Sequence, residues 1–490
     1  MVGSRTEKTR VYVAFLRGDS PGLFSSPPGF DAYRRMHPDA PVMTNDDILA
    51  RLRDECARVE LVGTGEPLTA EEAIREVHRQ KADLEGLLVF AAPHHEIPDA
   101  LLQPLPTIAV EPLLGWCPTV PFHAFKGRKV LTSCLPVRYR DKDPQVYARR
   151  IADITGKLRL IDAVSRMRRL RVLVVTDLPP LGYFEPMNEQ LDSTRHAYEQ
   201  VYVENLREVF GAELVAVPQQ RLFEKVASAS EADAQEIAEE WIRGAVALRG
   251  SNESEVLKSA KLYLAMKDLM NETGCQAITT EGFGWPPLGY DEANTKGIAS
   301  QGLSTSQLLT DGIAAASETL VDCLLTQQLG LWITGSAGLL GDYSIDFATD
   351  TAILAHCEGT FRPYADDRRT PYTIRNLPMV EENTGGACAQ PHYPIGETVT
   401  VAKLSMYRKR LSLFSGETVS GEDLFPYWAD ILGRSKVAVR TDAKALLENV
   451  DWETYGNHRV VLFGDHRQQL KEMAKLIGFE VFEKDRLWRD

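Results

Sequence analysis

The sequence has few cysteines, and their spacing does not suit a disulfide framework or a cage of thiolate ligands. Its 490 residues include seven cysteines, scattered along the chain without a CxxC pair. An odd, scattered set is typical of free thiols that pack as small apolar side chains in a reducing compartment. We therefore expect neither structural disulfides nor a site built from sulfur ligands.

Long hydrophobic runs are also absent from the sequence. Nowhere do about 18 apolar residues follow one another, which is the length that a membrane-spanning helix needs. The first residues, MVGSRTEKTR, do not lead into an apolar stretch long enough for a secretory signal. These absences predict a cytoplasmic protein with no membrane partner.

The chain lacks an excess of positive charge. It carries 55 Lys and Arg against 69 Asp and Glu, a formal net charge of −14. Nucleic-acid surfaces need clustered Lys and Arg, and a solvated helix end explains the one basic run, at residues 166–171. The charge argues against a nucleic-acid partner. The length, with 44% hydrophobic residues, indicates a globular protein of about three domains.

No phosphate-binding or dinucleotide-binding motif is present. The glycine-rich stretch at residues 335–341 reads GSAGLLG, which is neither a P-loop nor a GxGxxG that opens a helix after the first strand of a domain. We interpret it as a turn that brings the next residue, Asp342, towards an ion.

What the sequence does contain is an alternation of buried strands with amphipathic helices. Strands are predicted at residues 11–16, 59–62, 87–91, 107–110, 129–133, 172–175, 213–217, 275–280 and 331–333. Short strands with turn signals follow at 398–404, 410–414, 460–463 and 479–482. The pattern predicts an α/β fold with two doubly wound, Rossmann-like domains, residues 1–170 and 171–350, followed by a β-rich C-terminal domain, residues 351–490.

Three potential metal ligands lie at the ends of predicted elements. Glu318 follows an alanine-rich stretch and precedes an apolar helix. Asp342 follows the glycine-rich turn, and His356 ends an apolar run. Strand ends are where α/β proteins place their chemistry. Two carboxylates and an imidazole suit an octahedral divalent ion such as Mn²⁺, whereas the neighbouring Cys357 is expected on the opposite face of its strand.

This stretch resembles the metal-binding core of the L-fucose isomerase and L-arabinose isomerase superfamily. In the fucose isomerase pattern an alanine-rich turn leads to a Glu, and an Asp follows 24 residues later; here 342 − 318 = 24. The stretch HCEG at residues 356–359 is similar to the family's HCG-like strand end, and GDYSIDF at 341–347 is similar to the EDYTYHF-type stretch of arabinose isomerases.

A second match lies further along the chain. Residues 456–458 read Gly-Asn-His, which resembles the Asn-His step that carries the last metal ligand in both isomerase families. A GDH-type turn follows at residues 464–466, as in those families. The resemblance makes His458 a metal ligand and Asn457 a contact for a substrate hydroxyl.

The resemblance implies an aldose–ketose isomerase that acts on an open-chain sugar through an enediol. It implies Mn²⁺, or another divalent cation, held by Glu318, Asp342 and His458, with His356 as a further ligand or a neighbour of the ligands. Glu318 and Asp342 would be the catalytic carboxylates. It also implies a homo-oligomer, a hexamer or a tetramer, in which the first domain lends residues to a neighbouring subunit's site.

Three further residues are candidates for substrate contacts. Glu281 follows the predicted strand 275–280, and Trp285 could stack on the apolar face of a sugar. Arg17 follows the first strand. Each also has a structural interpretation: Glu281 as a cap of its glycine-rich loop, Trp285 as loop packing, and Arg17 as a partner in a salt bridge.

The chain departs from both isomerase families at the first ligand. Those families carry Glu-Gly-Asp, whereas residues 318–320 read Glu-Thr-Leu here. Loss of the Asp removes a partner of the Glu or a substrate contact. Two alternatives therefore stay open: a metal-dependent sugar enzyme of another class, namely an epimerase, lyase or hydrolase, and a non-catalytic sugar-binding paralogue.

Overall fold

The structure is a computed structural model, and the chain forms two compact units within it. The first unit joins Met1–Arg166 to Gln469–Phe479, and the second joins Met167–Gln468 to Glu480–Asp490. The division into three domains stays a prediction. The structure describes residues 8–17, 44–91, 97–102, 105–111, 128–135, 144–178, 195–281, 301–366, 368–377, 386–430, 433–451 and 456–486.

The first unit is built on a parallel sheet with the strand order β2-β1-β4-β5-β6, and β3 lies beside β1. Strands β4 and β5 are buried along their whole length. Their apolar runs therefore show no alternation with polar residues, as is usual for parallel sheets covered on both faces. The strands are β1 (Thr9–Leu16), β2 (Val59–Val62), β3 (Pro67–Leu68), β4 (Gly86–Phe90), β5 (Thr107–Glu111) and β6 (Val130–Cys134).

Helices α2 (Asn45–Glu55) and α3 (Ala70–Gln80) of this unit both begin at capping boxes. In each, the hydroxyl of a Thr accepts a hydrogen bond from the backbone N–H three residues later. The acidic side chain of that later residue accepts a hydrogen bond from the backbone N–H of the Thr. The longest helix is α4 (Pro144–Met167). Among the described residues, no helix is long and apolar enough to cross a membrane.

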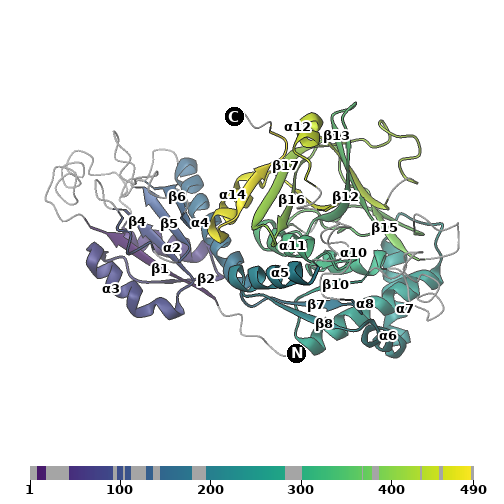
Figure 1. Cartoon of the computed structure of the whole chain (residues 1–490), viewed down its shortest axis with the longest axis horizontal. Helices are drawn as coiled ribbons and strands as arrows, with labels where there is room; N and C mark the ends of the chain where they lie inside the picture. The colour runs from purple at the N-terminus through teal and green to yellow at the C-terminus, as the bar shows by residue number, and fades with distance from the viewer. Residues whose placement is uncertain are drawn as a thin grey trace. The chain divides into compact units, whose positions relative to one another are not determined.

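The second unit contains another parallel sheet, with the strand order β11-β10-β7-β8. Its strands are β7 (Arg171–Val175), β8 (Glu213–Val217), β10 (Ala277–Thr280) and β11 (Ala315–Ala316). The helices are α5 (Arg195–Val209), α6 (Gln219–Ser228), α7 (Glu231–Gly244), α8 (Glu253–Thr273) and α10 (Gly302–Thr310). Figure 1 shows α6, α7 and α8 gathered together, and buried apolar residues of α7 and α8 join those of β7 and β10 in one core.

Mostly antiparallel strands form the rest of the second unit. The order β16-β19-β12-β13-β18-β17 closes on itself because β16 also pairs with β17, and β20 pairs in parallel with the first residues of β17. The strands are β12 (Leu339–Asp346), β13 (Thr351–His356), β16 (Thr398–Ser405), β17 (Arg410–Val419), β18 (Ser435–Arg440), β19 (His458–Phe463) and β20 (Glu480–Glu483). A small sheet of β9 (Ala247–Arg249), β14 (Tyr372–Arg375) and β15 (Cys388–Pro391) completes the unit.

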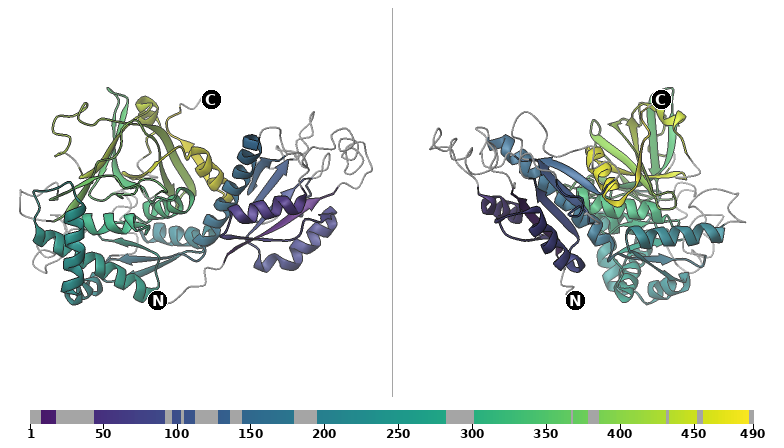
Figure 2. Two further views of the ribbon diagram at one scale, coloured as in Figure 1. Left: turned by 180° about the vertical axis from the view of Figure 1, so that it is seen from behind. Right: turned by 60° about the vertical axis from the view of Figure 1, so that its left-hand side comes forward.

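At this level the chain is an α/β protein with parallel sheets and a β-rich C-terminal region, as the sequence predicts. Helix α11 (Val321–Thr334) joins the two kinds of sheet in the second unit, because it contacts β10 and β11 on one side and β16 and β19 on the other. Figures 1 and 2 show this helical layer between the parallel strands and the barrel-like sheet.

One predicted strand is wrong: residues 331–333 form the last turn of α11. The first ten residues of α11 are buried on all sides, so the helix shows no polar stripe and its apolar run resembles a buried strand. The glycine-rich stretch that follows caps helix α11 and then passes close to the backbone of Val461. Gly335 ends α11 in the left-handed conformation, and a side chain at Gly338, with a φ of 74°, would meet the carbonyl oxygen of Val461.

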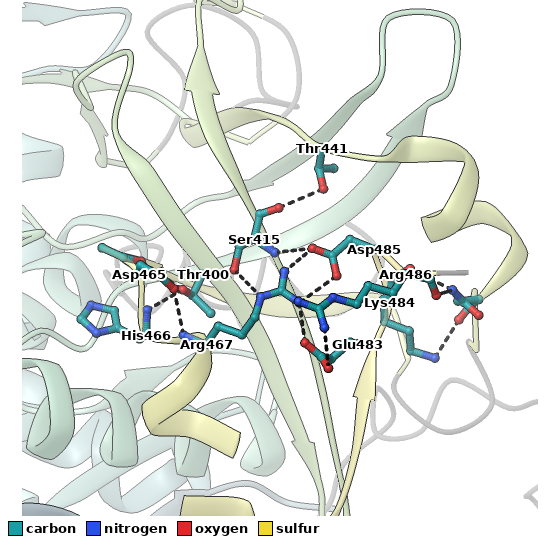
Figure 3. A network of polar contacts seen from close by, with 12 residues as sticks. Thr400, Ser415, Thr441, Asp465, His466, Arg467, Glu483, Lys484, Asp485 and Arg486 are labelled. Carbon is teal, nitrogen blue, oxygen red and sulfur yellow. Dashed lines mark hydrogen bonds and ion pairs between the residues drawn. The ribbon is translucent and has the colours of Figure 1, made fainter. Parts of the chain in front are cut away.

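A polar network fixes the end of the described chain to the barrel (Figure 3). The guanidinium of Arg467, which opens helix α14 (Arg467–Ile477), lies 2.8 Å from Glu483 and 3.0 Å from Asp485. Asp485 also accepts a hydrogen bond from the backbone N–H of Ser415 on β17, at 3.1 Å. The side chains of Arg467, Glu483 and Asp485 are 15%, 18% and 12% exposed, so these charges depend on one another for compensation.

Replacing Arg467 by Met is expected to remove the largely buried positive charge that faces Glu483 and Asp485. The opening free energy of the segment 480–486 should fall by about 3 kcal/mol, roughly a hundredfold in the opening equilibrium. Hydrogen–deuterium exchange of its amides measures this directly. Arg486→Met is the matched control, because Arg486 also contacts Glu483, at 3.3 Å, but is 62% exposed. It should change opening by no more than about 0.5 kcal/mol. Equal effects of both substitutions would contradict the role assigned to Arg467.

Candidate metal centre

Glu318 lies at the carboxyl end of the parallel sheet, between strand β11 and helix α11. The backbone N–H of Thr319 donates to the carbonyl oxygen of Thr280, at 2.9 Å, and so anchors this loop to the end of β10. Both Glu318 and Thr319 adopt the left-handed conformation, with φ of 64° and 54°. A β-branched residue such as Thr is strained there, and such strain gathers at functional sites.

Asp342 and His458 come together through the register of the barrel. They are directly opposite partners in the antiparallel pair β12–β19, so their side chains project from the same face. Asn457 precedes His458, and its side-chain amide donates to Oδ1 of Asp342 at 2.6 Å. The pairing therefore sets two predicted ligands and a predicted substrate contact next to one another.

His356 is the last residue of β13 and is opposite Ser435 of β18. The chain after it is held by hydroxyl groups of α10. The backbone N–H of Gly359 donates to Oγ of Ser306, at 3.1 Å, and that of Phe361 donates to Oγ1 of Thr310, at 2.9 Å. The small polar residues of this buried helix thus fix the segment that carries the imidazole.

The three residues Glu318, His356 and His458 form a compact cluster. Oε1 of Glu318 lies 3.7 Å from Nε2 of His356, and Oε2 lies 3.4 Å from Nε2 of His458. One ligand atom from each residue lies within 4.8 Å of the other two. The side chains are 16%, 6% and 4% exposed. A single carboxylate therefore faces two buried imidazoles.

Asp342 lies at the rim of this cluster. Its Oδ1 is 3.2 Å from Nε2 of His458, but Asp342 is not one of the three residues whose ligand atoms all lie within 4.8 Å of one another. Its side chain is 49% exposed. The structure therefore brings all four predicted ligands into one region, with Asp342 the most open to solvent.

The two imidazoles differ in charge. Burial lowers the pKa of His458 well below its usual value, and the positive charge of His356 acts in the same direction. For His356, burial opposes the charged form, but the carboxylates of Glu358 and Glu318 outweigh it and hold the pKa well above its usual value. These surroundings favour the neutral form of His458, whose lone pair a cation could use.

The cluster fits a divalent cation. Neither ring nitrogen of His458 has a hydrogen-bond partner, although the ring is buried and its Nε2 faces two carboxylates. An unpaired buried nitrogen is costly, and a cation would use its lone pair while compensating Glu318. Imidazole and carboxylate donors suit Mn²⁺ or a similar first-row ion. A cation would also displace the proton that otherwise sits on His356 between two carboxylates.

Glu358 is a residue of the site that the sequence did not single out. It is 1% exposed and lies 3.5 Å from Nδ1 of His356. Its Oε1 accepts hydrogen bonds from the backbone N–H and the hydroxyl of Ser317, at 2.9 and 2.7 Å. The only local signal was its place two residues after His356, at a spacing that puts two side chains on one face of an extended chain.

The other predicted substrate residues have different surroundings. The carboxylate of Glu281 accepts hydrogen bonds from Oγ1 of Thr176 at 2.8 Å, from the backbone N–H of Asp177 at 3.0 Å and from the side chain of Gln219 at 2.9 Å. It ties together the loops after β7 and β8, and it is not part of the cluster. Arg17 belongs to the first unit, where it lies 3.6 Å from Glu72. Trp285 lies outside the described residues.

The residues that follow Glu318 are buried. Leu320, where the sequence differs from the predicted resemblance, is fully buried. A buried acid stands two residues later instead: Asp322 accepts hydrogen bonds from the hydroxyl of Tyr202, at 2.7 Å, and the backbone N–H of Met406, at 3.2 Å. These bonds connect α11 with α5 and with the end of β16.

Mn²⁺ should bind the purified chain through the cluster. We expect one tight site that Glu318→Gln and His458→Ala each weaken by about 100-fold or more, beyond the 10- to 100-fold typical of residues that only orient a ligand. The paramagnetic resonance signal of free Mn²⁺ during titration measures the affinity. Glu281→Gln is the control and should bind as the wild type does. Unchanged affinity in both ligand variants would remove the cluster as a metal site.

The strained backbone at Thr319 makes a second prediction. At positive φ glycine is favoured over alanine, so Thr319→Gly should be more stable than Thr319→Ala by about 1 kcal/mol. The order should reverse at Thr326, a buried residue in the interior of α11, where alanine is favoured by about 1 kcal/mol. Denaturant unfolding of the four variants gives both differences. If the alanine variant were the more stable one at both positions, the backbone at Thr319 would not be strained.

Comparisons with known proteins do not identify the chain. No protein-family model matches it, and no curated protein does. Solved structures do match; one of them is a XylFII molecule, with 10% sequence identity over 60% of this chain and 86% of that chain. Its TM-score of 0.14 is too low to support an argument about fold or function.

Proposed function

We propose that this chain is a metal-dependent aldose–ketose isomerase that acts on an open-chain sugar through an enediol. One observation carries the proposal: Nε2 of His458 is buried without a hydrogen-bond partner while it faces the carboxylates of Glu318 and Asp342. Such a centre combines a place for a cation with a second carboxylate at its edge. The sequence resemblance to L-fucose and L-arabinose isomerases supports the same reaction.

The ligands in this proposal are Glu318, His356 and His458, which already surround one point. A bound divalent cation, Mn²⁺ by its preference for such donors, would polarise the carbonyl oxygen and the adjacent hydroxyl of an open-chain aldose as a Lewis acid. The low exposure of the three side chains keeps bulk water away from this point. Opposite charges therefore interact more strongly there than at the surface.

Asp342 is the residue placed to move the carbon-bound proton. Although the side chain is 49% exposed, partial desolvation raises the pKa of its carboxyl, His356 lowers it, and Glu318 raises it again, for a net rise. A raised pKa brings a carboxylate closer to the value that suits a general base near neutral pH. Asp342 would take the proton from C2 of the aldose to give an enediol and return a proton to C1 to give the ketose. The exposure of its side chain leaves room for a substrate beside it.

Two neighbouring groups complete the reaction. As the second carboxylate, Glu318 would move the proton from the hydroxyl at O2 to the oxygen at O1, so that protons balance over the whole step. Asn457 fixes the orientation of Asp342 through its amide N–H. Its side-chain oxygen is the atom that would accept a hydrogen bond from a substrate hydroxyl.

We further propose that both parallel sheets are Rossmann-like. With their strands renumbered in chain order and the two-residue β3 left out, the first reads 2-1-3-4-5 and the second 2-1-3-4. The first is the flavodoxin-like order, in which ligands bind at the carboxyl ends of the strands where the order reverses. In the second sheet this point lies between β7 and β10, where Glu281 meets Thr176. A sugar that extends from the cluster along this edge would reach Glu281.

A screen of aldoses in D₂O with Mn²⁺ tests the proposal. We expect at least one aldose to be converted to its ketose, with deuterium at C1, because a carboxylate that carries the proton exchanges it with solvent before returning it. Proton and deuterium NMR of the products measure both. Asp342→Asn should slow conversion by about 100- to 10,000-fold while changing Mn²⁺ affinity by less than about tenfold, since Asp342 lies outside the ligand cluster.

Other outcomes separate the remaining classes of function. Deuterium at C2 of an epimerised aldose would replace the isomerase by an epimerase, and cleavage products without deuterium would indicate a hydrolase. Tight sugar binding without Mn²⁺ binding and without conversion would make the chain a binding protein. An Asp342→Asn variant with wild-type turnover would remove Asp342 from the mechanism.

A further inference from the structure

Glu358 is a buried carboxylate whose position the proposed reaction does not explain. At 1% exposure, its charge needs compensation from the protein. Its Oε1 accepts two hydrogen bonds from Ser317 and lies 3.5 Å from Nδ1 of His356. A buried carboxylate held by these neighbours acts on them in return.

The two neighbours belong to two of the three segments that carry the ligands of the cluster. Ser317, which gives two hydrogen bonds to Oε1 of Glu358, is the residue before Glu318. His356, whose Nδ1 is 3.5 Å from the same oxygen, belongs to strand β13 of the barrel. Glu358 therefore links the end of the parallel sheet to the barrel within a few ångströms of the proposed ion.

The contact with His356 also decides which ring nitrogen meets the ion. A carboxylate beside Nδ1 favours a hydrogen on that nitrogen, which leaves the lone pair on Nε2 when the ring is neutral. Nε2 is the atom that faces Oε1 of Glu318, at 3.7 Å. The carboxylates beside His458 are those of Glu318 and Asp342, and both lie next to its Nε2. Of the two imidazoles, His356 is thus the one with a carboxylate next to its Nδ1.

We propose that Glu358 is the positioning residue of the centre: it orients His356 for binding through Nε2 and fixes the Ser317–Glu318 backbone opposite it. This inference rests on the proposed metal centre. Carboxylates that hold a ligating histidine in this way change metal affinity by 10- to 100-fold when they are removed. Glu358 touches neither the proposed substrate nor the ion, and its effect passes through His356 and Ser317.

Titration of the full chain with Mn²⁺ alone tests the inference, with the resonance signal of the free ion as the readout. Glu358→Gln keeps the shape of the side chain and should weaken Mn²⁺ binding by about 10- to 100-fold. Glu417→Gln, at an exposed position of β17, is the matched control and should bind as the wild type does. Far-UV circular dichroism verifies that the variants are folded.

A double substitution separates positioning from a general structural effect. If Glu358 acts on the ion as the partner of His356, then adding Glu358→Gln to His356→Ala should weaken binding by no more than about twofold, because the group it orients is gone and the amide oxygen of Gln can still accept the hydrogen bonds from Ser317. A full additional loss in that background would overturn the proposal, and so would wild-type affinity in Glu358→Gln. Should Glu358→Gln not fold, Glu358→Asp decides: its shorter side chain should weaken binding, and unchanged affinity overturns the inference. Wild-type protein that binds no Mn²⁺ would instead overturn the proposed centre itself.

Discussion

The partly buried carboxylate of Glu318 faces two imidazoles, and the rest of the proposed site depends on this arrangement. Its oxygens lie 3.7 and 3.4 Å from Nε2 of His356 and of His458. An anion at this depth needs positive charge close by. A proton on His356 supplies it in part, and a divalent cation shared by all three residues would supply it fully. Because either a proton or a divalent cation can compensate the charge of Glu318, this point is suited to bind an ion.

The arrangement exists because two kinds of sheet meet at helix α11. The parallel sheet delivers Glu318 at its carboxyl edge, where α/β proteins bind ligands. The barrel delivers His356 at a strand end and His458 next to Asp342 across a strand pair. Because α11 packs against both, a shift of one sheet against the other would separate the ligands. The buried polar contacts of Asp322 and Glu358 resist such a shift.

The two predicted catalytic carboxylates differ in their surroundings, which suggests different roles. Glu318 is 16% exposed and points at both imidazoles, whereas Asp342 is 49% exposed and held by Asn457. The first position suits a ligand and the second a group that exchanges protons with a substrate. The predicted sugar substrate, Mn²⁺ and homo-oligomer all stay predictions.

Local patterns determined much of the fold, because short runs of apolar residues and turn-forming residues are recognisable from the sequence alone. The strands near β1, β4, β7, β8 and β19 could all be predicted, and the resemblance singled out Glu318, Asp342, His356 and His458. Local patterns failed at residues 331–333, where burial on every side removed the helical period. Only the tertiary structure decided that the ligands converge, because the β12–β19 register joins residues over a hundred positions apart. The tertiary structure alone showed that Glu358 lies beside His356 and that Glu281 accepts hydrogen bonds from Thr176, Asp177 and Gln219. The sequence pattern around a residue does not reveal a hydrogen-bond partner that is distant along the chain.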